Sequence, residues 1–268
     1  MGDGAEVLDW YEFREDFEHV TGEVIEETLV SIYVNGFELA TLMATPCEQK
    51  ALALGFLKNE GFIGEMESVD HVHLSEHGCC VDLWLKHAIT QPEQRIITSG
   101  CGGGVTFRDP EVGFEALESA LTIDPGQIFK LFNGLQQPNS LYARARGVHA
   151  AALSDGERLL ASAEDVGRHN TIDKLVGVCM REGIETRERV LLVTGRISSE
   201  MLVKSVVMGC PIVASRNSPT SLSVSLARQF GVTLIGYVRR QTMRVYSSPE
   251  RLSGFDAKVS LPAELGTN

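Results

Sequence analysis

Residues 189–238 read RVLLVTGRISSEMLVKSVVMGCPIVASRNSPTSLSVSLARQFGVTLIGYV. Apolar runs of strand length alternate in this stretch with longer segments that fit helices. The predicted elements are a strand at 189–194, a helix at 199–208, a strand at 211–215, a helix at 219–229 and a strand at 232–238. Strands that alternate with helices are typical of a layered sheet, so this stretch predicts an α/β fold.

The alternation extends toward the N-terminus. Strands are predicted at 148–153 and 158–164, a helix at 169–181, and a further helix that begins at Asp124-Pro125. Upstream of residue 115 the alternation of strands and helices stops, which indicates a domain boundary there.

Hairpins dominate the part before the boundary. Asn35-Gly36 is a strong hairpin signal between predicted strands at Glu27–Tyr33 and Glu38–Met43. Thr45-Pro46 predicts a helix N-cap followed by proline at the first helical position, and the helix should end near Gly61. A second hairpin is predicted at 71–74 and 81–85.

The length of 268 residues allows one large or two small domains. We expect an acidic N-terminal segment (1–21), a smaller α+β domain (22–115), an α/β domain (116–252) and a C-terminal tail (253–268). No apolar run approaches the ~18 residues of a membrane helix. The acidic start is the reverse of a signal peptide, and six scattered cysteines do not form a disulfide scaffold, so we expect a cytoplasmic protein that binds no membrane.

The net charge of −12 is unevenly distributed. Residues 1–30 hold ten acids and a single basic residue, Arg14, whereas residues 201–249 hold six basic residues and no acid. Those six are Lys204, Arg216, Arg228, Arg239, Arg240 and Arg244. Arginine suits bidentate recognition of phosphate. Because the overall negative field opposes nucleic acid, we predict either a small anionic ligand or merely a solvated basic face.

Cys101 is the strongest candidate for a reactive residue. It stands in Ser99-Gly100-Cys101-Gly102-Gly103-Gly104, inside a long loop at 88–106 without clear periodicity. Flanking glycines leave the thiol uncovered and let backbone N–H groups converge on an anion. A chance cysteine in a flexible turn is the alternative.

Two segments, EDVGRH at 164–169 and TGRISSE at 194–200, each join a predicted strand to a predicted helix. Such junctions suit anionic ligands, which makes Arg168, His169 and Arg196 candidate binding residues. The alternative is that the acids of the first segment only complement the helix dipole. His149 is more typical of a core histidine.

A metal site is not expected. His71, His73, His77, Cys79 and Cys80 lie close in sequence, but they lack the spacing of a zinc site, and adjacent cysteines should point to opposite faces of a strand. His149 also lacks the H-x-E glutamate of zinc deaminases. We therefore expect no tightly bound zinc.

Six blocks occur in the order found in one family. They are TLMATPCEQKALALGFLKNEG (41–61), Cys101-Gly102, GVHAAA (147–152), EDVGRH (164–169), GRISSEM (195–201) and TLIGYVRRQTMRVY (233–246). Together they resemble the formate dehydrogenase accessory sulfurtransferases, over about residues 22–252.

The resemblance implies a sulfur carrier for the molybdenum cofactor. Such a carrier accepts sulfur from a cysteine desulfurase and passes it to the bis-molybdopterin guanine dinucleotide cofactor, which then enters formate dehydrogenase. It implies a C-terminal domain similar to the cytidine deaminase fold, with a layered mixed sheet, and we also expect a homodimer. Cys101 stands at the persulfide-forming position, and the stretch associated with the cofactor is Tyr237, Val238, Arg239, Arg240, Gln241 and Thr242.

One departure from the family pattern affects the mechanism. The family commonly has C-G-x-C-G in the loop, whereas this chain has Gly104 in place of the second cysteine. A single persulfide on Cys101 is therefore the expected chemistry. The alternative is a chaperone that binds the molybdenum cofactor without covalent chemistry.

Overall fold

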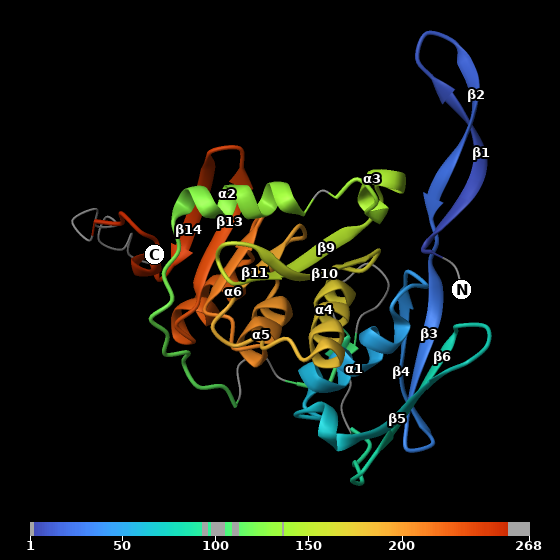
Figure 1. Ribbon diagram of the computed structural model, residues 1–268, viewed down its shortest axis with the longest axis horizontal. Helices are drawn as coiled ribbons and strands as arrows, with labels where there is room; N and C mark the ends of the chain where they lie inside the picture. Colours follow the sequence, from blue (N-terminus) through green and yellow to red (C-terminus); the bar gives the residue numbers. More distant parts are fainter. Residues whose placement is uncertain (1–2, 93–95, 98–104, 109–112, 136, 257–268) are drawn as a thin grey trace, which may run out of the picture.

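The computed structural model describes residues 3–92, 96–97, 105–108, 113–135 and 137–256, which form two large sheets with their helices, a projecting hairpin and one short two-stranded pair (Figure 1). The architecture is mixed α/β, as the sequence predicts. In the described chain, no helix is long and apolar enough to cross a membrane.

A mixed six-stranded sheet forms the larger layer (Figure 1). In spatial order its strands are β10 (Leu159–Asp165), β9 (His149–Ser154), β11 (Val190–Val193), β12 (Ile212–Ser215), β13 (Thr233–Arg239) and β14 (Thr242–Ser247). The central strands β11, β12 and β13 are parallel, and the other pairs are antiparallel. Their apolar runs are continuous because helices cover both faces of the sheet.

Helices on the two faces bury alternate residues of the same strands. Leu191 and Val193 pack toward α4 (Arg168–Glu182), α5 (Ser199–Val207) and α6 (Ser221–Gln229). Val190 and Leu192 pack toward α2 (Pro125–Gly134) on the other face. The short helix α3 (Leu141–Ala145) precedes β9, and a 3-10 turn at Pro249–Arg251 follows β14.

A four-stranded sheet forms the smaller layer. In spatial order its strands are β4 (Phe37–Ala44), β3 (Thr28–Val34), β6 (Cys80–Leu85) and β5 (Val69–Leu74). The helix α1 (Gln49–Glu60) buries Leu52, Phe56 and Leu57 in the core of this sheet, and a 3-10 turn at Met66–Ser68 leads into β5. Both hairpins predicted from the sequence are confirmed.

The two layers meet where α1 crosses α4. A Cβ atom on Gly55 would lie 1.8 Å from the backbone oxygen of Asp173, and one on Gly177 would lie 1.9 Å from the backbone oxygen of Ala51. The two helices therefore approach so closely that only glycine fits at these positions. The crossing holds the four-stranded layer against the six-stranded layer.

Thr45 does not cap α1, contrary to the sequence prediction. The helix begins at Gln49, after Glu48 in the left-handed region at φ 53°. Thr45 instead bonds across the two layers: its amide donates to the Asp165 carboxylate (3.0 Å), and its hydroxyl accepts from the Val166 amide (3.0 Å). This tertiary role outweighs local capping, which is why the helix begins later.

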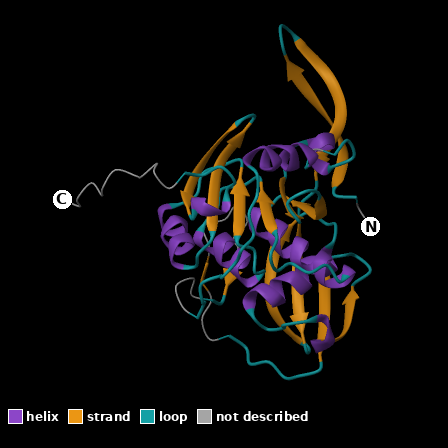
Figure 2. Cartoon of the chain, turned by 60° about the vertical axis from the view of Figure 1, so that its left-hand side comes forward, coloured by secondary structure: helices purple, strands orange, loops and turns teal. Residues whose placement is uncertain are grey.

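Three antiparallel strand pairs and one short helix were not predicted from the sequence. β1 (Ala5–Phe13) pairs with β2 (Phe17–Ile25) in the acidic N-terminal segment, and β14 pairs with β13 after a turn at Arg240–Gln241. Within the predicted long loop, β7 (Ile96–Ile97) pairs with β8 (Val105–Thr106). The short helix is α3. Figure 2 shows the β1–β2 hairpin rising away from the rest of the chain.

The glycine crossing leads to the first prediction. Gly55→Ala or Gly177→Ala forces a methyl group onto a backbone oxygen of the facing helix, so each should lower the free energy of unfolding by about 3 kcal/mol or more. Gly64→Ala is the control, because a Cβ there meets no atom within 4 Å. Urea unfolding followed by circular dichroism measures all three, and equal midpoints for the variants and the control would show that the crossing tolerates a side chain.

Candidate functional site

The carboxyl ends of β11, β12 and β13 lie at one edge of the six-stranded sheet, since the three strands are parallel. Ligands of open α/β sheets bind at this edge, outside the carboxyl ends of the strands. The residues that follow these strand ends are Thr194, Arg216-Asn217 and Arg240. All four residues carry side-chain donors, and the two arginines also carry a positive charge that suits an anion.

Asn217 joins the three strand ends. Its side-chain amide donates to the backbone oxygen of Thr194 (2.7 Å), its backbone amide donates to the Ser215 hydroxyl (2.9 Å), and its backbone oxygen accepts from the Tyr237 amide (3.2 Å). Neighbouring Arg216 is half-buried and donates to the backbone oxygen of Phe132 on α2 (3.1 Å). The edge is therefore held rigidly around the Arg216 guanidinium.

Two adjoining cavities open on either side of Arg216 and Asn217, which line both. The larger has a volume of about 420 Å³, and the smaller about 250 Å³. The larger is also lined by Phe129, Phe132, Asn133, Val238, Arg239 and Arg240. The smaller is also lined by Leu135, Tyr142, Val148, His149, Ala150, Glu164 and Thr194. Three guanidinium groups therefore surround the larger cavity.

The turn between β13 and β14 positions two of these guanidinium groups. Tyr237 and Arg240 adopt left-handed backbone conformations, at φ 52° and 47°, and the pairing of the strands shifts between Gly236 and Arg239. Non-glycine residues adopt this conformation at an energetic cost, and such strain gathers at functional sites. The Arg244 guanidinium lies 4.2 Å above the Tyr237 ring. This bulged turn leaves Arg239 and Arg240 exposed at the cavity.

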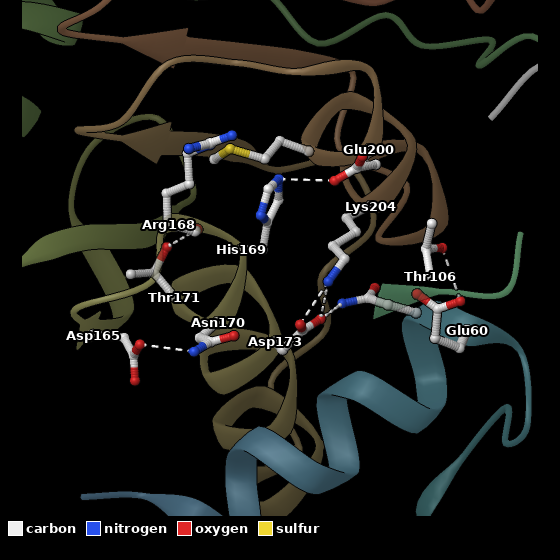
Figure 3. Close-up of polar contacts among 12 residues, drawn as sticks. Glu60, Thr106, Asp165, Arg168, His169, Asn170, Thr171, Asp173, Glu200 and Lys204 are labelled. Atoms are coloured by element: carbon white, nitrogen blue, oxygen red, sulfur yellow. Dashed lines mark hydrogen bonds and ion pairs between the residues drawn. The ribbon is translucent and has the colours of Figure 1, made fainter. Parts of the chain in front are cut away.

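The other predicted binding residues lie apart from this cavity. Arg168 and His169 are buried in the first turn of α4. The His169 Nε2 contacts α5 through the Glu200 carboxylate (2.9 Å) and the Ser198 hydroxyl (3.2 Å), as Figure 3 shows for Glu200. Arg196 is exposed in the connection from β11 to α5. The structure thus brings together Val238, Arg239 and Arg240 of the predicted set, with Tyr237, Gln241 and Thr242 in the same turn.

Cys101 lies outside the described residues, but the strands before and after it are described. Residues 98–104 join β7 to β8, and β8 is attached to the end of α1. The buried Glu60 carboxylate accepts hydrogen bonds from the Thr106 hydroxyl (3.0 Å) and the Phe107 amide (2.8 Å). Burial raises the pKa of Glu60. Thr106 and Phe107, which follow Cys101 in the sequence, are therefore tethered to the helix that crosses α4.

A buried ionic cluster lies next to this tether (Figure 3). The Lys204 ammonium contacts both carboxylate oxygens of Asp173 (2.7 and 2.5 Å), and the Asn59 amide donates to the same carboxylate (2.6 Å). Lys174, fully buried, pairs likewise with Asp165 (2.6 Å). Buried charges persist only when they are paired and hydrogen-bonded, so these contacts fix α1, α4 and α5 in register.

No group of three or more histidine, cysteine, aspartate or glutamate side chains that could hold a metal ion occurs in the part of the chain that the structure describes. The expectation that Cys79 and Cys80 point to opposite faces is wrong, because their sulfur atoms lie 3.7 Å apart. Cys79 precedes β6, so strand alternation does not apply to the pair.

Comparison with known families matches residues 25–253 to the FdhD/NarQ family. The chain belongs to this family. Curated relatives named sulfur carrier protein FdhD are 34% identical in Staphylococcus haemolyticus (87% of this chain, 90% of the relative) and 34% identical in Staphylococcus aureus strain MRSA252 (87% and 91%). A crystal structure from Desulfotalea psychrophila, described as a formate dehydrogenase accessory protein, is 25% identical, with a TM-score of 0.76 over 92% of this chain and 99% of that chain.

Sequence reasoning missed several residues that line the site of this FdhD/NarQ chain. Asn217 carries no local signal, because its role depends on three strand ends that meet only in the sheet. His149, interpreted as a core histidine, is half-buried and lines the smaller cavity. Burial, followed by the nearby charge of Arg168, lowers the pKa of His149. Its imidazole is therefore neutral at neutral pH.

The lowered pKa of His149 gives a pH-dependent prediction. The unfolded chain, where histidine titrates near ~6.5, binds the proton more readily than the folded chain. Stability from this group is thus complete above pH ~6.5 and falls as the pH drops toward the folded pKa. Between pH 7.5 and pH 5 the free energy of unfolding, measured with urea, should therefore fall less for His149→Gln than for the wild type. Exposed His77→Gln is the control; a His149→Gln profile that matches it would show that His149 titrates normally.

Proposed function

We propose that this chain carries sulfur to the molybdenum cofactor of formate dehydrogenase, as a cytoplasmic protein whose Cys101 is loaded by a cysteine desulfurase. Membership of the FdhD/NarQ family and relatives named sulfur carrier protein FdhD support this role. The structural observation that carries the proposal is the cavity of about 420 Å³ with Arg216, Arg239 and Arg240 at its lining. The six-stranded layer is proposed to be the family's cytidine deaminase-like unit.

The cavity suits a dinucleotide substrate. Guanidinium groups bind phosphate oxygens through paired, charge-assisted hydrogen bonds. Arg239 and Arg240 approach from the β13–β14 turn and Arg216 from the end of β12, so a diphosphate between them meets cations from two strands. In the proposal the guanine dinucleotide of the bis-molybdopterin cofactor lies here as cargo.

The smaller cavity suits the base of that dinucleotide. Leu135 and Val148 supply apolar surface, and Tyr142 and neutral His149 supply rings. The Glu164 carboxylate already accepts from the Leu141 and Tyr142 amides (2.7 and 3.1 Å), which fixes its position at the cavity lining. Carboxylate oxygens accept from the N–H groups of guanine, so the base is proposed to lie against Glu164.

The sulfur transfer needs one nucleophile. In the proposal the Cys101 thiolate attacks the outer sulfur of the desulfurase persulfide, the S–S bond of the donor breaks, and the donor leaves as a thiolate. The transferred sulfur atom is already at the oxidation level of a persulfide, so no external oxidant is consumed. The sulfur is then offered to molybdenum.

Loading of Cys101 is the decisive test of the carrier role. After incubation with cysteine and a cysteine desulfurase, the wild-type peptide that contains Cys101 should gain about 32 Da, the mass of one sulfur atom. The gain is expected on Cys101 because its thiolate is the proposed acceptor. Cys101→Ala should fold normally and fail to activate formate dehydrogenase in cells that lack their own copy. Cys79→Ala, which removes an exposed thiol, should retain activity. An active Cys101→Ala chain, or an unloaded wild type, would favour the non-covalent chaperone.

The arginine cavity is tested by nucleotide binding. Arg239→Ala with Arg240→Ala should weaken binding of guanosine diphosphate by roughly 30-fold or more, since each charge-assisted pair contributes about 1.5–3 kcal/mol before solvent screening. Isothermal titration calorimetry at fixed salt gives the dissociation constants. Arg158→Ala is the matched control, because Arg158 is an exposed arginine that lines neither cavity. Equal affinities for the double variant and the control would contradict the proposal that Arg239 and Arg240 bind the phosphates.

A further inference from the structure

The turn that leads from β5 into β6 holds two neighbouring thiols that the proposed function leaves unused. The Cys79 and Cys80 sulfur atoms lie 3.7 Å apart; Cys79 is exposed and Cys80 is half-buried. Neither residue lines the two cavities at the edge of the six-stranded sheet. Figure 1 shows the turn at the outer margin of the four-stranded layer. The pair is therefore a separate group of sulfur ligands that solvent can reach.

Backbone hydrogen bonds hold both cysteines in place. The Cys79 oxygen accepts from the Ser31 amide of β3 (2.8 Å). The Cys80 oxygen accepts from the Ser75 amide (3.0 Å). Gly78 closes the turn directly before the two cysteines in a left-handed conformation at φ 69°, and its amide donates to the Ser75 oxygen (2.9 Å). Because the backbone that carries the two thiols is already ordered, a ligand that binds both of them pays little entropy for ordering it.

The Ser75 hydroxyl supports the same pair. Its oxygen accepts a hydrogen bond from the Cys80 amide (3.1 Å) and lies 3.8 Å from the Cys79 sulfur. Its O–H group can therefore donate to a thiolate at Cys79. Burial, followed by the neighbouring Cys79 thiol, raises the pKa of Cys80. Two negative charges on adjacent sulfur atoms repel each other, so a doubly deprotonated pair needs a cation between them.

The distance between the sulfur atoms suits a single metal ion. Thiolates hold zinc at about 2.3 Å, and two bonds of that length at a tetrahedral angle place their sulfur atoms about 3.8 Å apart. The observed separation of 3.7 Å therefore lets both sulfur atoms bind one ion of this size. Soft thiolate ligands select soft ions, among them monovalent copper and zinc.

The number of protein ligands decides between these two ions. Structural zinc is almost always bound by a full tetrahedral set of side chains. No third histidine, cysteine, aspartate or glutamate joins the pair within the described ranges. His71 is already engaged, since its ring stacks on Trp84 with the centroids 6.0 Å apart and its Nδ1 lies 3.1 Å from the Asp70 carboxylate. Two thiolates alone can satisfy monovalent copper, which is the softer ion.

We propose that Cys79 and Cys80 form a binding site for monovalent copper, with one ion held between the two sulfur atoms. Each thiol releases its proton to solvent as its copper–sulfur bond forms. The copper stays monovalent, so the step consumes neither an oxidant nor a reductant. Two thiolates and one monovalent cation leave a single negative charge, toward which the Ser75 hydroxyl can donate. The inference does not rest on sulfur transfer, because the site uses neither Cys101 nor the arginine cavity.

Competition for copper tests the site. Under anaerobic conditions the wild type should take one Cu(I) ion per chain from bicinchoninic acid, a chelator whose copper complex is coloured. Cys79→Ser and Cys80→Ser should each weaken binding by roughly 100-fold or more, because the single remaining thiolate loses the effective concentration of the second. Cys47→Ser and Cys101→Ser are the matched controls: each removes a thiol elsewhere in the chain and should leave the copper affinity unchanged.

Alkylation of the wild type gives a second measurement that does not depend on how a variant folds. One equivalent of Cu(I) should protect Cys79 and Cys80 from iodoacetamide, but not the Cys101 thiol, as read from peptide masses. Copper affinity that both serine variants at the turn retain, affinity that Cys101→Ser loses, or Zn(II) bound as tightly as Cu(I) would each overturn the proposal. Persulfide loading of Cys101 should persist in Cys79→Ser, so a failure of sulfur transfer is distinguished from a failure of the copper site.

Discussion

The close crossing of α1 and α4 is the constraint on which the arrangement of this protein depends. Gly55 and Gly177 let the two backbones meet where any side chain would collide with a carbonyl oxygen. Each helix packs on a different sheet, so the crossing fixes one layer relative to the other. The end of α1 in turn holds the end of β8 and the residue after it, because the Glu60 carboxylate accepts hydrogen bonds from Thr106 and Phe107.

Charge is buried around the same crossing. The ion pairs Lys174–Asp165 and Lys204–Asp173 are nearly inaccessible to solvent, and both use residues of α4. Such pairs add little net stability compared with apolar packing, but loss of one partner is costly. Their effect here is on geometry: Asp165 also binds the Thr45 amide, and Asp173 also binds Asn59. If α1 or α5 shifted along α4, these buried charges would lose their partners. The ion pairs therefore fix the position of the helices relative to one another.

The sequence predicted most of this fold where apolar runs are continuous. The elements between residues 148 and 238 were placed within about two residues of their observed bounds, because strands buried on both faces and capped helices leave clear patterns. The β1–β2 hairpin was not predicted because its many acidic residues interrupt the alternation of apolar and polar side chains that marks a strand. Strand β14 was not predicted because its exposed residues are largely polar. Gly55, Gly177 and Asn217 have no local signature: each acquires its role only when distant elements meet.

The proposed function needs two parts of the chain that lie far apart in the sequence, the arginine cavity and the segment that contains Cys101. The arginine cavity belongs to the edge of the six-stranded sheet, while the Cys101 segment begins and ends on strands tied to α1 through Glu60. In the proposed sulfur transfer these two parts must work together, and the contact between α1 and α4 is what joins the described residues of one to those of the other. If the proposed transfer is right, loosening the helix crossing should impair delivery of sulfur even where Cys101 and the three arginines are intact, because Gly55 and Gly177 hold the two layers together.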